Sequence, residues 1–299
     1  MTINAPVRYR LGAARLIEHF RANAADYFAL LVRRRSAGGI FRVTASARLV
    51  IGTVVLVCLI LMTMVEIDAW SISVVLRLPL WLTELFDHIT DLGRSVWFLL
   101  PIAVMLMLMA ALASPGLSLM SQRVLAAIAV RLGFLFSAIA LPGLVFTIVK
   151  RLIGRARPLV GAGSDPFLYL PLGWKVEYAS FPSGHATDAF AAATAIGALW
   201  PKARPLMWTY ALLIAVSRVM VTAHFPSDVL AGAIAGTLGA LLVRGWFAAR
   251  RLAFTASPDH PVKPMPGPSF ARLRRVFREL IAASASSRTF QTTALKGRG

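Results

Sequence analysis

Residues whose types could handle a phosphoryl group gather in three short clusters that lie far apart in the chain. The clusters are Lys150 with Arg157-Pro158, then Pro182-Ser183-Gly184-His185, then Ser217-Arg218 with His224 and Asp228. Cations that are fixed in advance stabilise the charge that moves during phosphoryl transfer. A histidine paired with a carboxylate can serve as the nucleophile. The set therefore predicts a site that holds a phosphoryl group and transfers it to a histidine.

The first cluster supplies two cations at the end of an apolar stretch. Arg157 lies seven residues after Lys150, about two helical turns, so both side chains could share one helix face before Pro158 ends the helix. An arginine can grip two phosphoryl oxygens, whereas a lysine acts as a point charge. Basic residues beside a membrane span often only snorkel toward water. We interpret Arg151 and Arg155 as flanking charges of that kind.

The second cluster opens the next apolar stretch. A helix start leaves backbone N–H groups free, and these attract anions. Gly184 lets the backbone approach an oxygen, Ser183 can donate its hydroxyl, and His185 would face the leaving group. The alternative is an ordinary helix cap with a chance histidine. Asp188, one turn further, could hold the His185 imidazole or merely favour the positive helix end, and both interpretations stay open.

The third cluster places a cation inside an apolar stretch and a histidine in the turn after it. A charge such as Arg218 within a membrane segment is costly and usually marks function. His224 lies in a short turn, and Pro226 suits the first position of the following helix. Asp228 is four residues from His224 and can orient one ring nitrogen, which leaves the other free to attack.

Composition indicates a membrane protein. The chain has 299 residues, of which 58% are hydrophobic, against about 45–50% in soluble domains. A span needs about 20 mostly apolar residues. The sequence predicts six spans, which together form an all-α six-transmembrane helical bundle, near 49–65, 96–113, 132–149, 185–200, 206–223 and 229–247. The stretch 66–95 carries five acidic residues and is predicted to lie at the membrane surface.

The net charge of +19 is explained by where the charge lies. With six spans, three quarters of the 32 Lys and Arg residues fall on the side that holds both termini. Positive charge collects on the cytoplasmic side of a membrane, so both termini are predicted to be cytoplasmic and the three clusters external. This distribution argues against a nucleic-acid partner. The single cysteine, Cys58, excludes an intrachain disulfide.

Three segments are predicted: a basic preface over 1–48, the six-span domain over 49–247, and a basic, partly disordered tail over 248–299. The preface could form an amphipathic helix on anionic lipid or a solvated positive flank. The tail holds a basic segment, 270–281, with apolar residues at helical spacing that could also lie on the membrane. Gly232 and Gly236 predict close helix packing within the bundle, in preference to a dimer contact.

The three clusters resemble the signature of the type 2 phosphatidic acid phosphatase superfamily. They read KRLIGRARP, PSGH and SRVMVTAHFPSD, and the resemblance covers about Ser95 to Val243. It implies a six-span bundle with the site near the outer membrane boundary. It also implies that His224 is the nucleophile, that Asp228 orients it, and that His185 protonates the leaving alcohol and later activates water. The phosphoryl oxygens would be held by Lys150, Arg157, Ser183, Gly184 and Arg218.

The family requires no metal or other cofactor, and the nearest approach to a metal-ligand pattern here is His88 between Asp87 and Asp91. Membrane members act on phosphatidic acid, phosphatidylglycerol phosphate, undecaprenyl pyrophosphate or lipid A phosphates. We therefore expect a lipid phosphate phosphatase in a bacterial inner membrane, with its site facing the periplasm and anionic lipids at its basic termini. The alternatives are a lipid-to-lipid phosphotransferase and a non-catalytic lipid-binding protein.

Overall fold

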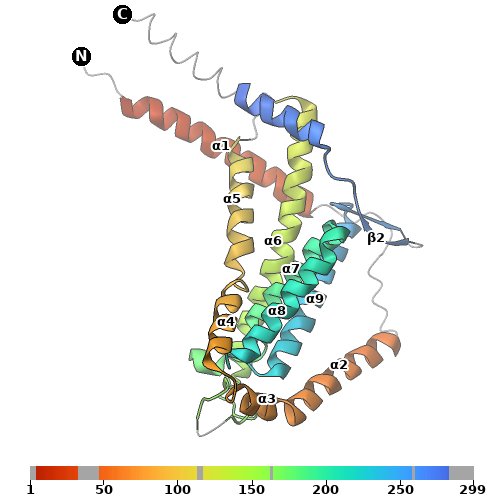
Figure 1. The fold of residues 1–299 in the computed structure, drawn as a ribbon. Helices are drawn as coiled ribbons and strands as arrows, with labels where there is room; N and C mark the ends of the chain where they lie inside the picture. The colour runs from red at the N-terminus through yellow and green to blue at the C-terminus, as the bar shows by residue number, and fades with distance from the viewer. Residues whose placement is uncertain (1–4, 33–46, 113–116, 162–163, 258–259, 283–299) are drawn as a thin grey trace, which may run out of the picture.

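The computed structural model describes residues 5–32, 47–112, 117–161, 164–257 and 260–282, and this part of the chain is mostly helical. Every apolar stretch that the sequence singles out forms a helix (Figure 1). These helices are α2 (Ala47–Glu66), α5 (Val96–Leu112), α6 (Leu119–Ile153), α7 (Gly184–Leu199), α8 (Arg204–Met220) and α9 (Pro226–Ala249). Each of the six predicted stretches therefore overlaps a helix, although α6 begins at Leu119, well before the predicted start at 132.

Four stretches of the described chain are long and apolar enough to cross a membrane: Leu49–Glu66, Leu80–Ala111, Leu119–Ile153 and Pro226–Ala249. These stretches make the chain a multi-pass membrane protein. Helices α7 and α8, with 16 and 17 residues, are shorter than the roughly 20 residues of a typical span. A count of six spans therefore stays a prediction.

The remaining helices lie at the two ends of the bundle. Helices α3 (Asp68–Val75) and α4 (Leu80–Asp91) share one end with the loop that joins α6 to α7 (Figure 1). Helix α1 (Ala5–Val32) and a helix over 270–282 lie at the opposite end (Figure 1). The prediction that 66–95 is a surface segment and not a span is wrong in part, because one candidate span begins at Leu80. Within α3, Asp68 and Ile72 are completely buried.

The tail is more ordered than its proline content suggests. It contains a two-stranded antiparallel sheet of β1 (Phe254–Ser257) and β2 (His260–Pro264), which the sequence did not predict. Phe254 is fully buried and packs edge-on against Phe134 of α6, with ring centres 4.8 Å apart. This aromatic contact explains why the chain folds back after α9. Residues beyond 282, where composition predicts disorder, lie outside the described part.

The basic helix over 270–282 is attached to the start of α6. Val276 is buried against that helix, with Leu280 beside it, and Glu279 accepts hydrogen bonds from the hydroxyl and the backbone N–H of Ser118, the N-cap of α6. Phe270 and Phe277 are exposed. The predicted helical spacing is confirmed, and contact of this helix with anionic lipid stays a prediction.

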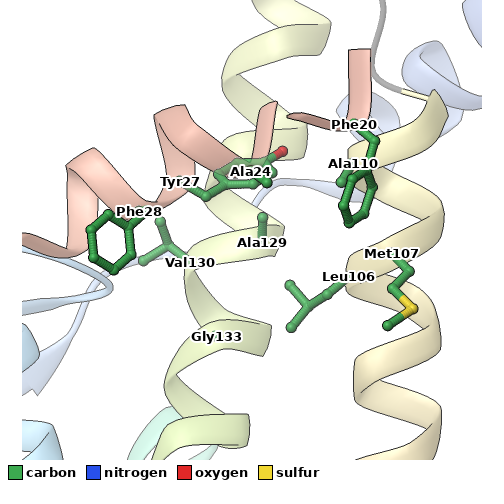
Figure 2. Close-up of a pocket in the computed structure, with 10 residues that line it drawn as sticks. All are labelled: Phe20, Ala24, Tyr27, Phe28, Leu106, Met107, Ala110, Ala129, Val130 and Gly133. Atoms are coloured by element: carbon green, nitrogen blue, oxygen red, sulfur yellow. The ribbon is translucent and has the colours of Figure 1, made fainter. Parts of the chain in front are cut away.

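Helix α1 packs on the bundle through its described aromatic side chains. Phe20, Tyr27 and Phe28 lie over α5 and α6, and together they line one side of an open apolar cavity of about 280 Å³ (Figure 2). Asn23 donates a hydrogen bond of 2.8 Å to the carbonyl of Ala110 in α5. The described part of α1 therefore contacts the bundle, and its contact with anionic lipid stays a prediction.

Helix α7 is the centre of the fold, and it is lined by small side chains. Its buried residues are mostly alanines, which lets α6, α8 and α9 approach its backbone. A Cβ atom added to Gly232 of α9 would lie 2.5 Å from the carbonyl oxygen of Ser183, and one added to Gly236 would lie 2.1 Å from that of Thr187. The two glycines thus serve packing inside the bundle, as predicted.

Replacement of Gly236 tests this close approach. We expect Gly236→Ala to lower the free energy of unfolding by about 1–3 kcal/mol, because α9 must move away from α7. Gly133→Ala in α6 is the matched control, since nothing lies within 4 Å of the added Cβ atom, and it should stabilise by at most about 1 kcal/mol. Thermal unfolding in detergent, followed by circular dichroism, measures both. Equal effects would contradict the packing argument.

Candidate active site

His224 and Asp228 face each other across the turn between α8 and α9. Helix α9 begins at Pro226, as predicted, with Phe225 as its N-cap. The Asp228 carboxylate accepts a hydrogen bond of 2.9 Å from the backbone N–H of Phe225. Its Oδ2 atom lies 3.7 Å from His224 Nδ1. The same carboxylate therefore bonds to the first turn of the helix and faces the Nδ1 side of the imidazole.

Ser180 is a third member of this arrangement that the sequence did not reveal. Its hydroxyl donates a hydrogen bond of 2.6 Å to Asp228 Oδ2 and lies 3.4 Å from His224 Nδ1. The backbone N–H of Ser180 donates to the carbonyl of Arg155, which ties the two ends of the α6–α7 loop together. The loop thus carries a polar side chain directly to the histidine and its carboxylate.

Helix α6 ends sooner than predicted. It stops at Ile153, because Gly154 adopts the left-handed conformation with φ of 67°. A Cβ atom at Gly154 would lie 1.9 Å from the carbonyl oxygen of Leu170, so only glycine fits there. Arg157 therefore does not share a helix face with Lys150, and its position is set instead by a backbone hydrogen bond to the carbonyl of Glu177.

The interpretation of Arg155 as a flanking charge is wrong. Its side chain is completely buried and forms ion pairs with Asp228 and with Asp68 of α3, the latter at 2.7 Å. Burial works against the charged guanidinium, but the two carboxylates outweigh it and raise the pKa of Arg155. Asp68 also accepts hydrogen bonds from the backbone N–H and the hydroxyl of Ser227.

Arg218 is held beside His224 by both backbone and side chain. The N–H groups of Ala223 and His224 donate to its carbonyl, at 3.1 and 3.2 Å. Its guanidinium is almost fully buried and donates a hydrogen bond of 2.7 Å to the Thr90 hydroxyl of α4. Burial, followed by the charges of Arg218 and Arg157, lowers the pKa of His224 to about 4 against the opposing effect of Asp228. The lowered pKa favours the neutral imidazole.

Ser183 occupies the N-cap of α7 without capping it. An N-cap serine usually accepts a hydrogen bond from the first turn, but the Ser183 side chain makes none. A Cβ atom at Gly184 would lie only 3.6 Å from Lys150 Nζ, so the ammonium group lies against the first turn of α7. The start of this helix thus combines free N–H groups, a hydroxyl and a cation in one place.

Several buried donors at this end of the bundle have no partner within the described residues. They include Ser183 Oγ, Arg157 Nε and Arg218 Nε. Buried polar groups are normally hydrogen-bonded, because an unpaired one costs about 1–3 kcal/mol. These three donors belong to residues that the sequence assigns to phosphate binding. Their arrangement can bind a small oxyanion.

His185 and Asp188 leave the first turn of α7 in different directions. His185 is half-buried and interacts electrostatically with His224, Arg218 and Lys150, which places it near these three residues. Asp188 is hydrogen-bonded to Ser95 and interacts with Lys150. Among the described residues, no hydrogen bond joins Asp188 to His185. Of the two predicted roles, support of the His185 imidazole therefore finds no geometric basis.

The structure brings all of the predicted site residues to one end of the bundle. Lys150, Arg157, Ser183, Gly184, His185, Arg218, His224 and Asp228 come from α6, the loop after it, α7, α8 and α9. Sequence reasoning missed Asp68, Thr90, Arg155 and Ser180, which hold these residues in place. Within the described ranges, no group of three His, Cys, Asp or Glu side chains could hold a metal ion.

Comparison with known proteins agrees with this site. The family model of the PAP2 superfamily matches residues 131–252, which include all eight predicted site residues. A lipid A 1-phosphatase of Rhizobium etli is 33% identical over 182 residues, which cover 60% of this chain and 78% of the relative. A lipid A 1-phosphatase of Rhizobium johnstonii is 38% identical over 126 residues, which cover 42% of this chain and 52% of the relative.

Among solved structures, the PAP2-type phosphatidylglycerolphosphate phosphatase of Bacillus subtilis is similar with a TM-score of 0.45 and 22% identity, over 64% of this chain and 94% of the other. The chain belongs to the PAP2 superfamily, the type 2 phosphatidic acid phosphatases. It is a phosphatase, a hydrolase that acts on phosphoric ester bonds.

Thr90 offers a test of the anion site that leaves the predicted residues untouched. Thr90→Val removes the acceptor of the buried Arg218 guanidinium, so Arg218 should lose its fixed position. We expect inhibition by inorganic phosphate to weaken about tenfold. Thr83→Val on the same helix is the control, because the Thr83 hydroxyl bonds only to the local carbonyl of Leu80. If both variants bind phosphate like the wild type, Thr90 does not position Arg218.

Proposed function

We propose that this enzyme hydrolyses a lipid phosphate monoester or pyrophosphate through a phosphohistidine on His224. The observation that carries the proposal is that a histidine–carboxylate pair and unpaired buried donors lie at the same end of the bundle. The His224–Asp228 pair lies near buried donors of Arg157, Ser183 and Arg218 that have no partner among the described residues. A tetrahedral phosphoryl group bound to those donors would present its phosphorus atom to His224 Nε2.

In the first half-reaction, Nε2 of His224 attacks the phosphorus atom and the bond to the lipid oxygen breaks. His185, protonated in the complex with the anionic phosphoryl group, gives its proton to the departing lipid oxygen, which leaves as an alcohol or, from a pyrophosphate, as a lipid phosphate. In the second half-reaction, neutral His185 takes a proton from water as the water oxygen attacks phosphorus. The N–P bond breaks, inorganic phosphate leaves, and both histidines return to their starting states. Asp228 stabilises the positive charge that the His224 ring carries between the two steps.

Basic side chains supply the charge that phosphoryl transfer requires. Lys150, Arg157 and Arg218 would hold the phosphoryl oxygens, together with Ser183 and the N–H groups at the start of α7 around Gly184. Since these groups neutralise the oxygens without a metal ion, we expect phosphate release to continue in EDTA.

Lipid A is the substrate class that we favour. The two relatives above are both lipid A 1-phosphatases, and one of them is matched over 78% of its length. We therefore propose the 1-phosphate of lipid A as the first substrate to test. Phosphatidic acid, phosphatidylglycerol phosphate and undecaprenyl pyrophosphate are the comparison substrates.

The phosphohistidine is tested by substitution of the nucleophile. The purified wild type should release phosphate from lipid A 1-phosphate in EDTA, and His224→Ala should lower kcat by about 10⁴-fold or more. His88→Ala is the matched control, because this exposed histidine lies outside the site. Rapid quenching with labelled substrate should trap a phosphoenzyme in the wild type and in His88→Ala, but not in His224→Ala.

Retained turnover in His224→Ala would contradict the mechanism. Addition of an acceptor lipid separates hydrolysis from phosphotransfer: a phosphorylated acceptor as the main product would favour the phosphotransferase, and free phosphate alone would exclude it. No release from any of the four lipid phosphates would contradict the proposed substrate class.

The distribution of basic residues and the location of the terminal helices support one orientation of the protein in the membrane. We propose that the site faces the periplasm of a bacterial inner membrane, with both termini in the cytoplasm. Two observations support this: the basic residues concentrate in the terminal segments, and helix α1 and the helix over 270–282 lie at the end opposite the site (Figure 1).

Cysteine labelling tests this orientation. In a Cys58→Ser background, the exposed residues Lys175, in the site loop, and Arg272, in the tail helix, are each replaced by cysteine. A membrane-impermeant maleimide added to intact spheroplasts should label Lys175→Cys and leave Arg272→Cys unlabelled. Permeabilised cells, in which both should react, provide the control. The reverse pattern would contradict the proposed orientation.

A further inference from the structure

Arg155 lies between two carboxylates, and only one of them belongs to the predicted site. We infer that Arg155 and Asp68 are positioning residues that set both the direction and the charge of Asp228 toward His224. The inference rests on the proposed function, because it assigns these residues a part in the reaction of His224. Neither side chain is assigned a contact with the substrate.

All three nitrogens of the Arg155 guanidinium donate hydrogen bonds. Its Nε atom donates to the carbonyl of Pro166 at 2.9 Å, one amino group donates to Asp68 Oδ2 at 2.7 Å, and the other donates to the Ser227 hydroxyl at 2.7 Å and to Asp228 Oδ1. The ring of Phe225 lies 4.6 Å from its central carbon. A planar fork with this many partners has one orientation, which a lysine could not reproduce.

The two oxygens of the Asp228 carboxylate have different partners, because Arg155 contacts only one of them. Oδ1 pairs with Arg155, whereas Oδ2 accepts hydrogen bonds from Ser180 and the Phe225 N–H and faces His224. Rotation of the carboxylate would break all of these contacts together. Arg155 thus fixes which oxygen meets the imidazole, although Arg155 itself does not touch that ring.

Asp68 affects the charge of this arrangement. Both of its oxygens accept hydrogen bonds from Ser227, and Oδ2 also accepts one from Arg155. Burial raises the pKa of Asp68, whereas these hydrogen bonds and the Arg155 charge favour the ionised carboxylate. One buried cation is therefore shared by two buried anions, since the side chains of Arg155, Asp68 and Asp228 are all completely buried. The excess negative charge leaves Asp228 able to stabilise the cationic ring of a phosphorylated His224. Without Asp68, Arg155 would neutralise Asp228 one to one.

The ionisable groups that face His224 come from each element packed around it. They are Asp228 of α9, Arg218 of α8, His185 of α7 and Arg157 of the loop after α6. All four remain in the variants below, so a change in the pH profile reports the altered charge at Arg155 or Asp68.

The test uses two isosteric or near-isosteric changes of opposite charge. Asp68→Asn and Arg155→Gln should each lower kcat by about tenfold or more, because both disturb Asp228. KM and inhibition by inorganic vanadate should stay within about twofold, because the phosphate donors are unchanged. Neutral His224 is the nucleophile, so its pKa sets the acid limb of kcat/KM. Loss of the cation in Arg155→Gln should move that limb to higher pH, and loss of the anion in Asp68→Asn should move it to lower pH.

Two further variants separate positioning from folding. Arg131→Gln is the matched control: this partly buried arginine of α6 donates to the carbonyls of Met265 and Pro266 at the far end of the bundle. It should reduce thermal stability without moving the pH limb. If Asp68→Asn or Arg155→Gln is not recovered folded, Ser227→Ala replaces it. That change removes only the bridging hydroxyl and should lower kcat several-fold at unchanged KM.

The outcomes distinguish this inference from the proposed function. An active wild type and an inactive His224→Ala, together with wild-type kcat in the Asp68, Arg155 and Ser227 variants, would overturn the positioning role alone. Limbs that move in the same direction, or vanadate inhibition that weakens in parallel with kcat, would do the same. A wild type without phosphatase activity on lipid phosphates would overturn the proposed function and this inference with it.

Discussion

The carboxylate of Asp228 is the group on which the site depends most. It caps α9 through the Phe225 N–H, it pairs with Arg155, and it faces His224. A helix cap normally stabilises by about 1 kcal/mol, and here the same carboxylate also faces the His224 ring. The orientation of His224 is therefore tied to the start of a membrane helix, which moves little once the helix is packed. The link through Asp228 to the start of α9 thus helps to hold the His224 imidazole in place.

The second constraint is the close approach of α9 to α7. Gly232 and Gly236 permit it, and the Ser183 N–H completes it with a hydrogen bond of 3.0 Å to the carbonyl of Asp228. This contact brings the anion-attracting start of α7 next to the histidine and its carboxylate. The backbone of Ser183 is held by Asp228, which leaves its hydroxyl available to a ligand. Ser183 and Asp228 therefore both join α7 to α9 and belong to the candidate site.

The sequence predicted the helices and the eight site residues because both leave local signals. Apolar stretches of sufficient length mark helices, and the histidines and basic residues lie at fixed spacings near the ends of those helices. Arg155 was misjudged because a helical projection was extended past Gly154, where the left-handed turn redirects the chain. Asp68 could not have been found in this way, since its partners Arg155 and Ser227 lie 87 and 159 residues away. Tertiary contacts of that kind have no sequence period.

The charges at this end of the bundle are consistent with a phosphate monoester as the ligand. Arg155 is already compensated by Asp68 and Asp228, so it contributes no free positive charge. Lys150, Arg157 and Arg218 form no ion pair with a carboxylate closer than 4.0 Å within the described residues. Burial penalises these cations until an anion joins them. A monoester carries up to two negative charges, whereas the phosphodiester of an ordinary membrane lipid carries one. The monoester therefore gains more from the same three cations, and this difference favours it over the far more abundant phosphodiesters of the surrounding bilayer.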